Sequence, residues 1–219
     1  MPYERGMSVI KKALVLGTAT VTTAAGLLMF GNQASARDTE FRAKLRDPSG
    51  DVVGSVTFRV TRDAMKVDAK LRNITIDPDK PNTFRGFHIH ANNDPANGRG
   101  CVADPSAPPA TWFVSADGHF SDPPGKDHGA HTGDLPSPLV LADGKARLKF
   151  TTHRIDPSML RGRAVILHAG PDNFGNVPVG TADNQYTPND PTVAPSLTKR
   201  TGNAGNRVAC GVIKRSRWS

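Results

Sequence analysis

The stretch VVGSVTFRV, from Val52 to Val60, is the clearest determinant of the fold because apolar and polar residues alternate along it. Successive side chains of a β-strand point to opposite faces, so Val56, Phe58 and Val60 share one face. The opposite face carries polar side chains, those of Ser55, Thr57 and Arg59. This period of two predicts a strand with one face in an apolar core.

Short strand-like segments recur on both sides of this stretch. Turn sequences separate some of them, among them Asp47–Gly50 and the Asp143-Gly144 pair. Together with residues 52–60, the predicted strands cover residues 39–46, 64–74, 84–90, 139–141, 146–151, 163–168 and 207–213. No segment has a convincing amphipathic helical period. The sequence therefore predicts an all-β fold, an eight-stranded antiparallel Greek-key barrel or sandwich.

Two segments between the predicted strands are long, residues 91–138 and residues 170–202. Their composition is that of loops, since the first is rich in Gly, Pro, Asp and Asn. Loops of this length are uncommon in a compact domain and are usually functional. Both contain or adjoin histidine clusters, so we expect two long functional loops.

The first 36 residues have the composition of a targeting segment. Two lysines precede an apolar stretch over residues 13–30, and Ala34-Ser35-Ala36 matches a signal-peptidase site. We expect a signal peptide over residues 1–36, cleaved after about Ala36, and one domain over residues 37–219. An uncleaved membrane anchor is the alternative, but threonine and glycine dilute the stretch. The prediction is an exported protein, extracellular or in the cell envelope, without stable membrane insertion after cleavage.

The chain is basic, with 28 Lys and Arg against 20 Asp and Glu and a net charge of +8. The first 36 residues hold three of the basic and one of the acidic side chains, which leaves +6 for the remaining chain. These basic residues are scattered along the sequence rather than grouped. The pattern indicates solubility and attraction of anions, not binding of nucleic acid.

Six of the seven histidines fall in four short clusters. The clusters read GFHIH, DGHF, HGAHTGD and ILHAG, and their potential ligands are His88, His90, His119, His128, His131, Asp134 and His168. Neutral imidazole is the commonest metal ligand in proteins, so this set is large enough for two metal ions. The alternative is that each histidine makes only a local hydrogen bond.

The first cluster points to copper. His88 and His90 stand two residues apart in a predicted strand, so both side chains point to the same face. His168 ends another short apolar strand and, with one more histidine, gives a four-nitrogen site without sulfur. Nitrogen-rich sites of this kind suit Cu(II).

The loop clusters point to zinc. His119, His128, His131 and Asp134 lie within sixteen residues of one loop. Three nitrogens and one carboxylate oxygen fill a tetrahedron, and a closed four-ligand zinc site is structural. We expect such a site to order a loop that has little apolar material of its own.

Cys101 and Cys210 are the two cysteines of the chain. An oxidising compartment, which export predicts, favours a disulfide between them. In a chain-entropy description, closing a loop of about a hundred residues contributes roughly 4–5 kcal/mol. Two free buried thiols are the alternative.

Five motifs of this chain strongly resemble those of copper/zinc superoxide dismutases of the bacterial exported type: GFHIH, DGHF, HTGDLP, ILHAGPDNFG and GNAGNRVACGVI. They occur in the family's order between residues 40 and 213. The resemblance implies an enzyme that dismutes superoxide to oxygen and hydrogen peroxide, with copper and zinc as cofactors. The implied copper ligands are His88, His90, His119 and His168. The implied zinc ligands are His119, His128, His131 and Asp134, so that His119 bridges the two ions.

The resemblance implies further roles. Asp172 would accept hydrogen bonds from one copper histidine and one zinc histidine. Arg207 would lie beside copper, where it attracts and orients superoxide, and His119 would also be catalytic. Cys101 and Cys210 match the family's disulfide within one subunit. The implied partner is the superoxide anion, with a homodimer as a possibility and no nucleic acid.

The alternative function is an exported protein that binds or buffers copper or zinc without significant dismutase activity. Arg207 and a bridging His119 argue against it, because storage requires neither. The connection after GFHIH and the loop over residues 170–202 are longer than is usual in the family. Both differences concern substrate steering and subunit contacts, and neither affects a predicted metal ligand.

Overall fold

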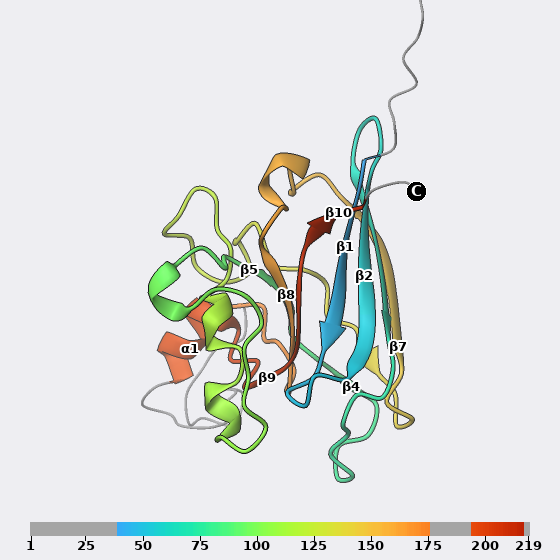
Figure 1. Cartoon of the computed structure of the whole chain (residues 1–219), viewed down its shortest axis with the longest axis vertical. Helices are drawn as coiled ribbons and strands as arrows, with labels where there is room; N and C mark the ends of the chain where they lie inside the picture. Colours follow the sequence, from blue (N-terminus) through green and yellow to red (C-terminus); the bar gives the residue numbers. More distant parts are fainter. Residues whose placement is uncertain (1–38, 176–193, 217–219) are drawn as a thin grey trace, which may run out of the picture. The chain divides into compact units, whose positions relative to one another are not determined.

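The structure, a computed structural model, describes residues 39–175 and 194–216 (Figure 1). The predicted signal peptide and its cleavage site lie outside these residues. The strands are β1 (Glu40–Arg46), β2 (Val52–Val60), β3 (Met65–Leu71), β4 (Thr83–Phe84), β5 (Phe87–His90), β6 (Leu139–Val140), β7 (Ala146–Thr152), β8 (Ala164–His168), β9 (Arg207–Val212) and β10 (Lys214–Arg215). The described helices are α1 (Ala194–Thr201) and the short 3-10 helices η1 (Pro95–Asn97), η2 (Pro109–Thr111), η3 (Val114–Ala116) and η4 (Pro157–Met159).

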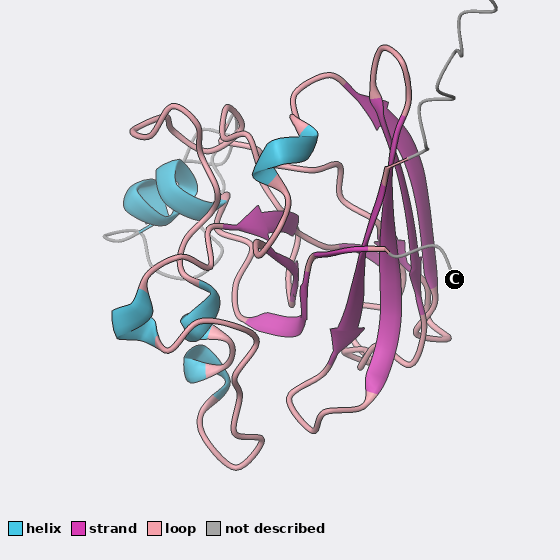
Figure 2. Ribbon diagram, turned by 45° about the horizontal axis from the view of Figure 1, so that its top comes forward, coloured by secondary structure: helices cyan, strands magenta, loops and turns pink. Residues whose placement is uncertain are grey.

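Most strands belong to one antiparallel sheet. Its order is β5-β8-β9-β1-β2-β3-β7, and β10 pairs with β1. The sheet curls into a half-barrel, and β4 and β6 form a separate two-stranded sheet (Figure 2). Each predicted strand segment contains a strand, which confirms the all-β antiparallel fold.

The predicted strand over residues 84–90 is interrupted. Strand β4 pairs with β6, whereas β5 pairs with β8 in the large sheet. Gly86 lies at the break, where a Cβ would collide with the Ala204 side chain. The Gly86 amide donates to the Gly170 carbonyl at 2.9 Å. The break therefore separates β5, with its two histidines, from β4 and places it beside β8.

The alternation along β2 matches its burial. Val56 and Phe58 have no exposed surface, and Val60 packs partly buried against the core. Phe58 pairs with Phe41 of β1 and with Val67 of β3, both of which are buried. Full burial of one such side chain contributes about 1.5–3 kcal/mol. The apolar core therefore lies on the inner face of the sheet, and the outer face is polar.

Helix α1 occupies the end of the second long segment, where the sequence pattern predicts only loop. Its eight residues are too few to display a helical period. The helix is hydrogen-bonded to residues of both long loops. The Asn173 side-chain amide donates to the Thr198 hydroxyl at 2.9 Å, and the His128 backbone amide donates to the Lys199 carbonyl at 2.6 Å. Among the described helices, none is long and apolar enough to cross a membrane.

Candidate metal centre

Strand β5 presents two histidines on one side. His88 and His90 are buried. Phe87, which precedes them, and Ile89, which lies between them, are buried as well. Phe87 and Ile89 join the apolar core, so the two imidazoles face away from it. His168 ends β8, the strand that neighbours β5, and is also buried. Three predicted ligands thus come from two adjacent strands.

The first long loop covers the free edge of β5. Loop and strand residues pair in two isolated backbone bridges, His88–Asp134 and His90–His119. Ile89, between the two histidines, donates its amide to Gly133 and accepts from Phe120, each at 2.8 Å. A side chain at position 133 would collide with the Ile89 carbonyl, so glycine permits this approach. Backbone pairing therefore brings loop side chains to the β5 histidines.

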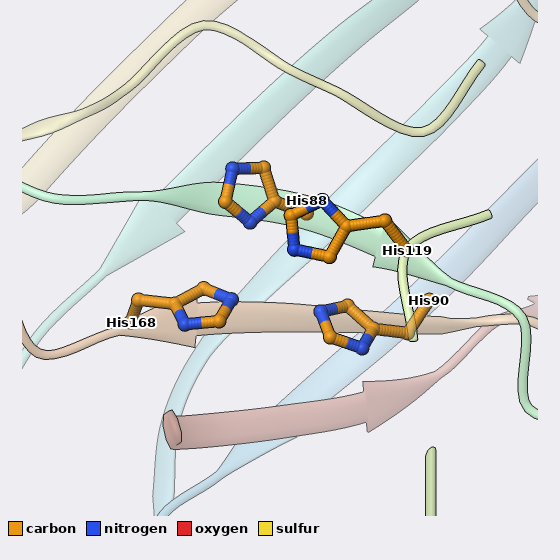
Figure 3. Close-up of side chains that lie close together, drawn as sticks. All are labelled: His88, His90, His119 and His168. Atoms are coloured by element: carbon orange, nitrogen blue, oxygen red, sulfur yellow. The ribbon is translucent and has the colours of Figure 1, made fainter. Parts of the chain in front are cut away.

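Four imidazoles converge on one point (Figure 3). Each offers a nitrogen, and these atoms lie within 4.8 Å of one another. The buried nitrogens without a hydrogen-bond partner include His88 Nδ1, His90 Nε2, His119 Nε2 and His168 Nε2. A buried polar atom without a partner costs about 1–3 kcal/mol. Four such lone-pair donors at one point fit the ligand set of a metal ion.

Hydrogen bonds fix the orientation of three of these rings. Their opposite nitrogens donate as follows: His88 Nε2 to Asp172 Oδ2 at 2.6 Å, His90 Nδ1 to the Asp117 carbonyl at 2.8 Å, and His168 Nδ1 to the Gly205 carbonyl at 2.9 Å. Because one nitrogen carries the proton, the other keeps a lone pair for a metal. The surrounding protein thus selects the tautomer that a metal site requires.

A second set of ligand atoms surrounds one carboxylate oxygen. Asp134 Oδ1 lies 3.1 Å from His119 Nδ1, 3.2 Å from His128 Nδ1 and 3.3 Å from His131 Nδ1. A tetrahedron with zinc–nitrogen distances of about 2.0–2.1 Å has edges of roughly 3.3 Å. His128 Nε2 donates to Asp172 and His131 Nε2 donates to a backbone carbonyl, which leaves lone pairs on both Nδ1 atoms. These donors around a carboxylate fit a bound cation.

His119 belongs to both sets. Its Nε2 is one of the four converging nitrogens, and its Nδ1 faces Asp134. The centroids of the His88 and His119 rings are 4.0 Å apart, so the two sets adjoin. His88, His119, His128 and Asp134 also offer ligand atoms within 4.8 Å of one another.

Asp172 connects the two sets. One carboxylate oxygen accepts from His88 Nε2 at 2.6 Å and the other from His128 Nε2 at 2.8 Å. The Phe174 amide donates to the same carboxylate at 2.7 Å. Gly202, with a φ of +62°, leaves room for this group, since a Cβ there would collide with Asp172 and His128. The sequence motifs predict the role of Asp172 but not that of Gly202, because a single glycine in a loop gives no signal of its role.

Arg207 reaches the same region from β9. Its Nη1 donates to the Phe113 carbonyl at 2.5 Å and its Nη2 to the Asp117 carbonyl at 2.6 Å. The Asp117 carbonyl also accepts from His90, so the guanidinium and one converging imidazole share an acceptor. The role of Asp117 cannot be predicted from its side chain, because it acts here through its backbone carbonyl, which every residue type offers. The loop thus holds a partly buried positive charge near the four nitrogens.

Burial determines the protonation of the converging rings. It lowers the pKa of His119 to about 3, against hydrogen bonding to Asp134. Burial also holds the pKa values of His90 and His168 well below normal, and neighbouring histidines and Arg207 lower them further. These rings are therefore neutral near neutral pH, which is the form that binds metals.

The neighbouring carboxylates raise the pKa of His128, whereas burial lowers the pKa of the converging rings. Burial lowers the pKa of His128 as well, but hydrogen bonds to Asp134 and Asp172 outweigh burial and raise the pKa to about 9. Burial raises the pKa of both carboxyl groups, but hydrogen bonds from histidines hold these pKa values far below normal. The two carboxylates thus favour a positive charge at His128, which a cation bound to Nδ1 would supply in place of the proton.

Cys101 and Cys210 form a disulfide, as the sequence predicts, with Cα atoms 5.5 Å apart. The bond ties the first long loop to β9, the strand that also carries the arginine of the site. Ser115 fixes the residues beside Cys101: its hydroxyl donates to the Gly100 carbonyl at 2.8 Å and accepts from the Val102 amide at 3.0 Å. The loop carbonyls that hold the arginine are therefore anchored to the sheet.

Comparison with known proteins agrees with these observations. Residues 52–213 match the family model described as copper/zinc superoxide dismutase (SODC). A protein of Mycolicibacterium paratuberculosis named Cu-Zn superoxide dismutase is 35% identical over 187 residues, which cover 82% of this chain and 76% of that protein. A protein of Deinococcus radiodurans with the same name is 30% identical over 187 residues, covering 79% of this chain and 83% of that protein.

A solved structure is similar as well. The crystal structure of the clock protein EA4 matches with a TM-score of 0.55 and 26% identity, covering 80% of this chain and 94% of that chain. The antiparallel half-barrel, the two adjoining sets of imidazoles and the matched sequences agree with one another. The chain belongs to the copper/zinc superoxide dismutase family.

Proposed function

We propose that this protein dismutes superoxide to oxygen and hydrogen peroxide at a copper ion. The observation that carries the proposal is the convergence of four buried ring nitrogens that have no hydrogen-bond partner. The proposed copper ligands are His88 Nδ1, His90 Nε2, His119 Nε2 and His168 Nε2. A four-nitrogen set without sulfur suits Cu(II). Bound copper supplies reversible one-electron oxidation and reduction.

We assign zinc to the set around Asp134, with His119 Nδ1, His128 Nδ1 and His131 Nδ1 as the other ligands. His88 also lies near this set, but its Nε2 is hydrogen-bonded to Asp172 and its Nδ1 belongs to the copper set. Four protein ligands leave no open position, so the zinc site is structural. Its role is to hold the first long loop against β5, and with it the shared ring of His119.

Arg207 attracts and orients the substrate in this proposal. Two carbonyls hold its guanidinium in place, and the side chain remains partly exposed, so a small anion can approach it. Fixed positive charge at a site mouth raises the local concentration and the association rate of an anionic substrate. The remaining N–H groups can donate to superoxide as it arrives.

His119 also holds a proton in this proposal. Formation of hydrogen peroxide from superoxide requires two protons, and a buried site has to deliver them. His119 Nε2 is buried and faces the other three nitrogens, while Nδ1 stays with Asp134. Whenever it does not bind the metal, Nε2 can therefore hold a proton for the product, while the ring keeps its position through Nδ1.

The test compares metal content with turnover in the same sample. The chain from residue 37 onward is loaded with copper and zinc, with zinc alone, or with neither, and metals are quantified by mass spectrometry. Superoxide decay is then followed by pulse radiolysis. The proposal expects catalysis only where copper is bound. Stoichiometric copper without catalysis would instead support a metal-buffering protein.

A variant tests the role of Arg207. Arg207→Ala should lower the rate constant about 10-fold or more and weaken its dependence on ionic strength, because steering by a fixed charge is screened by salt. Copper content should not change. An unaltered rate constant in a copper-loaded variant would remove Arg207 from the proposal.

We also propose that residues 1–36 are a signal peptide, that cleavage follows about Ala36 and that the mature domain is residues 37–219. The disulfide between Cys101 and Cys210 supports export, because such bonds persist in oxidising compartments.

A homodimer is a further proposal, supported by Phe84 and Leu139, which pair across β4 and β6 and remain 58% and 37% exposed. Mass spectrometry of the secreted protein tests the cleavage site, and sedimentation tests the dimer.

A further inference from the structure

The outer face of β1, β2, β3 and β7 concentrates positive charge. Strand pairing aligns its outward residues in three rows: Glu40–Arg59–Lys66–Thr151, Arg42–Thr57–Asp68–Lys149 and Lys44–Ser55–Lys70–Arg147. Seven of these twelve residues are Lys or Arg, two are acidic and three carry hydroxyls. None is apolar or aromatic. We call these twelve residues the basic face.

The acidic residues neutralise only part of this charge. Glu40 pairs with Arg42 at 3.1 Å and with Arg59 at 3.0 Å. Asp68 pairs with Lys149 at 3.2 Å and with Arg147 at 4.0 Å. Three exposed lysines remain without an ion pair among the described residues, namely Lys44, Lys66 and Lys70.

Like charges also stand directly opposite each other on this face. Arg59 of β2 pairs with Lys66 of β3, and Lys70 of β3 pairs with Arg147 of β7. Like charges in directly opposed positions destabilise an antiparallel sheet. Ion pairs with Glu40 and Asp68 offset this repulsion at Arg59 and Arg147 only, whereas Lys66 and Lys70 have no such partner among the described residues. An anionic ligand would supply the counter-charge that these two lysines lack.

The basic face contains a groove. A cavity of about 590 Å³ is lined by Ser55 and Thr57 of β2, by Asp68, and by longer cationic side chains of the adjacent strands, including Arg42, Lys66 and Lys70. The lining also includes Val67 and Phe150, but Val67 belongs to the apolar core and Phe150 packs partly buried against it. Short hydroxyl side chains between long cationic ones make a trough rather than a plane. A linear chain of anionic groups fits such a trough better than a flat bilayer surface does.

The groove lies away from the proposed metal centre. The loops and α1 gather beside β5 and β8, whereas β2 and β7 lie toward the other end of the same sheet (Figure 1). Binding at the basic face therefore leaves the centre accessible. It would hold an enzyme at an anionic polymer without covering its substrate path.

We propose that the basic face binds a linear polymer whose charges are phosphodiester groups and which carries no bases, such as a polyol phosphate. Phosphate groups satisfy lysine and arginine through charge-assisted hydrogen bonds. Single-stranded nucleic acid is disfavoured because the twelve residues offer no aromatic ring for stacking. Membrane insertion is disfavoured because they offer no apolar side chain.

The experiment measures binding of fluorescent poly(glycerol phosphate) to the mature chain over a series of salt concentrations. The test variant is Lys44→Gln with Lys66→Gln and Lys70→Gln, which removes the three unpaired lysines. The matched control is Lys80→Gln with Lys145→Gln and Arg161→Gln, which removes the same charge from exposed loop residues. A second variant replaces the same three face lysines by Arg and keeps the charge.

The test variant should bind about 100-fold more weakly at low salt, since each lysine near an anionic surface contributes to affinity. Its plot of log affinity against log salt should be less steep by about 2, the counterion release of three contacts to a single chain. The control and the arginine variant should bind as the unmodified chain does. The melting temperature should be no lower than that of the control, because the substitutions relieve two opposed like-charge pairs. Superoxide decay should match the control, which shows that the metal centre is intact.

Three results would overturn the proposal. An equal loss in the control variant would show that only total charge matters. Tighter binding of oligo(dT) or of phosphatidylglycerol vesicles than of the probe would assign the face to nucleic acid or membrane. Aggregation of the test variant with unchanged probe binding would show that the lysines only keep this surface soluble.

Discussion

Strands β2 and β5 belong to the same sheet but bury their residues differently. On β2, inner apolar residues such as Phe58 alternate with outer polar residues such as Thr57, and no described segment covers the outer side completely. On β5 all four residues are buried, because a loop covers the outer side and brings its own imidazoles. We call the part of the sheet around β2 the open half and the part around β5 the covered half. The open half is stabilised by apolar packing. The covered half contains polar atoms that only hydrogen bonds and bound cations can satisfy.

The largest effect should come from removing a ligand at the centre of the covered half. At metal sites, loss of a hydrogen-bond partner of a ligand lowers affinity or activity about 10–100-fold. His90→Ala removes a proposed ligand itself, so it should lower the dismutation rate constant by more than this. The measurement is pulse radiolysis with metal analysis. His153→Ala is the control, because His153 is exposed and lies outside the clusters. Full activity of a copper-loaded His90→Ala protein would contradict the proposed ligand set.

The open half should respond through stability instead. Phe58→Ala removes a fully buried ring and should lower the free energy of unfolding by about 3–5 kcal/mol. Urea unfolding followed by circular dichroism measures the change. The folded fraction should retain its metals. Loss of copper from folded protein would show that the two halves are not separable in this way.

The disulfide tests how the covered half is fastened to the sheet. Replacing Cys101 and Cys210 by Ser should lower the free energy of unfolding by about 2–5 kcal/mol, since the bond closes a loop with a sequence separation of 109. Dithiothreitol should lower the free energy of unfolding of the unmodified protein to nearly that of the variant, and should not change that of the variant. A reductant effect of equal size on both proteins would point to another cause.

Asp172 should give the smallest of these effects, shared between both metals. Asp172→Ala removes the acceptor of His88 and His128, and should weaken copper and zinc binding by about 10–100-fold each. Competition with chelators measures both affinities. Asp68→Ala, on the open half, is the control and should leave them unchanged. A loss confined to one metal would mean that Asp172 does not connect the two sets.

Local patterns were sufficient to predict much of this molecule. Alternation places Phe58 inside and Thr57 outside, and the same rule places His88 and His90 on one side of β5. These predictions succeed because the direction of a strand side chain depends on its neighbours in sequence. The break at Gly86 has no such signal, since it follows from contact with Ala204, which is distant in the chain.

Other features depend on backbone or on pairing. Asp117 holds both His90 and Arg207 through its carbonyl, and Gly202 contributes space, so neither side chain reveals its role. The basic face likewise could not be predicted from the sequence. Its lysines and arginines occur at every second position of separate strands and appear scattered until the strands pair in register.

Strand β5 is the last strand of its sheet, and the partner of its outer edge is a loop rather than another strand. The proposed zinc would hold His119 and Asp134, and with them this loop, against β5. Without it, the loop would no longer shield the amides and carbonyls of β5 from a strand of another molecule. The ligands proposed for chemistry would also be what keeps each molecule separate from the next.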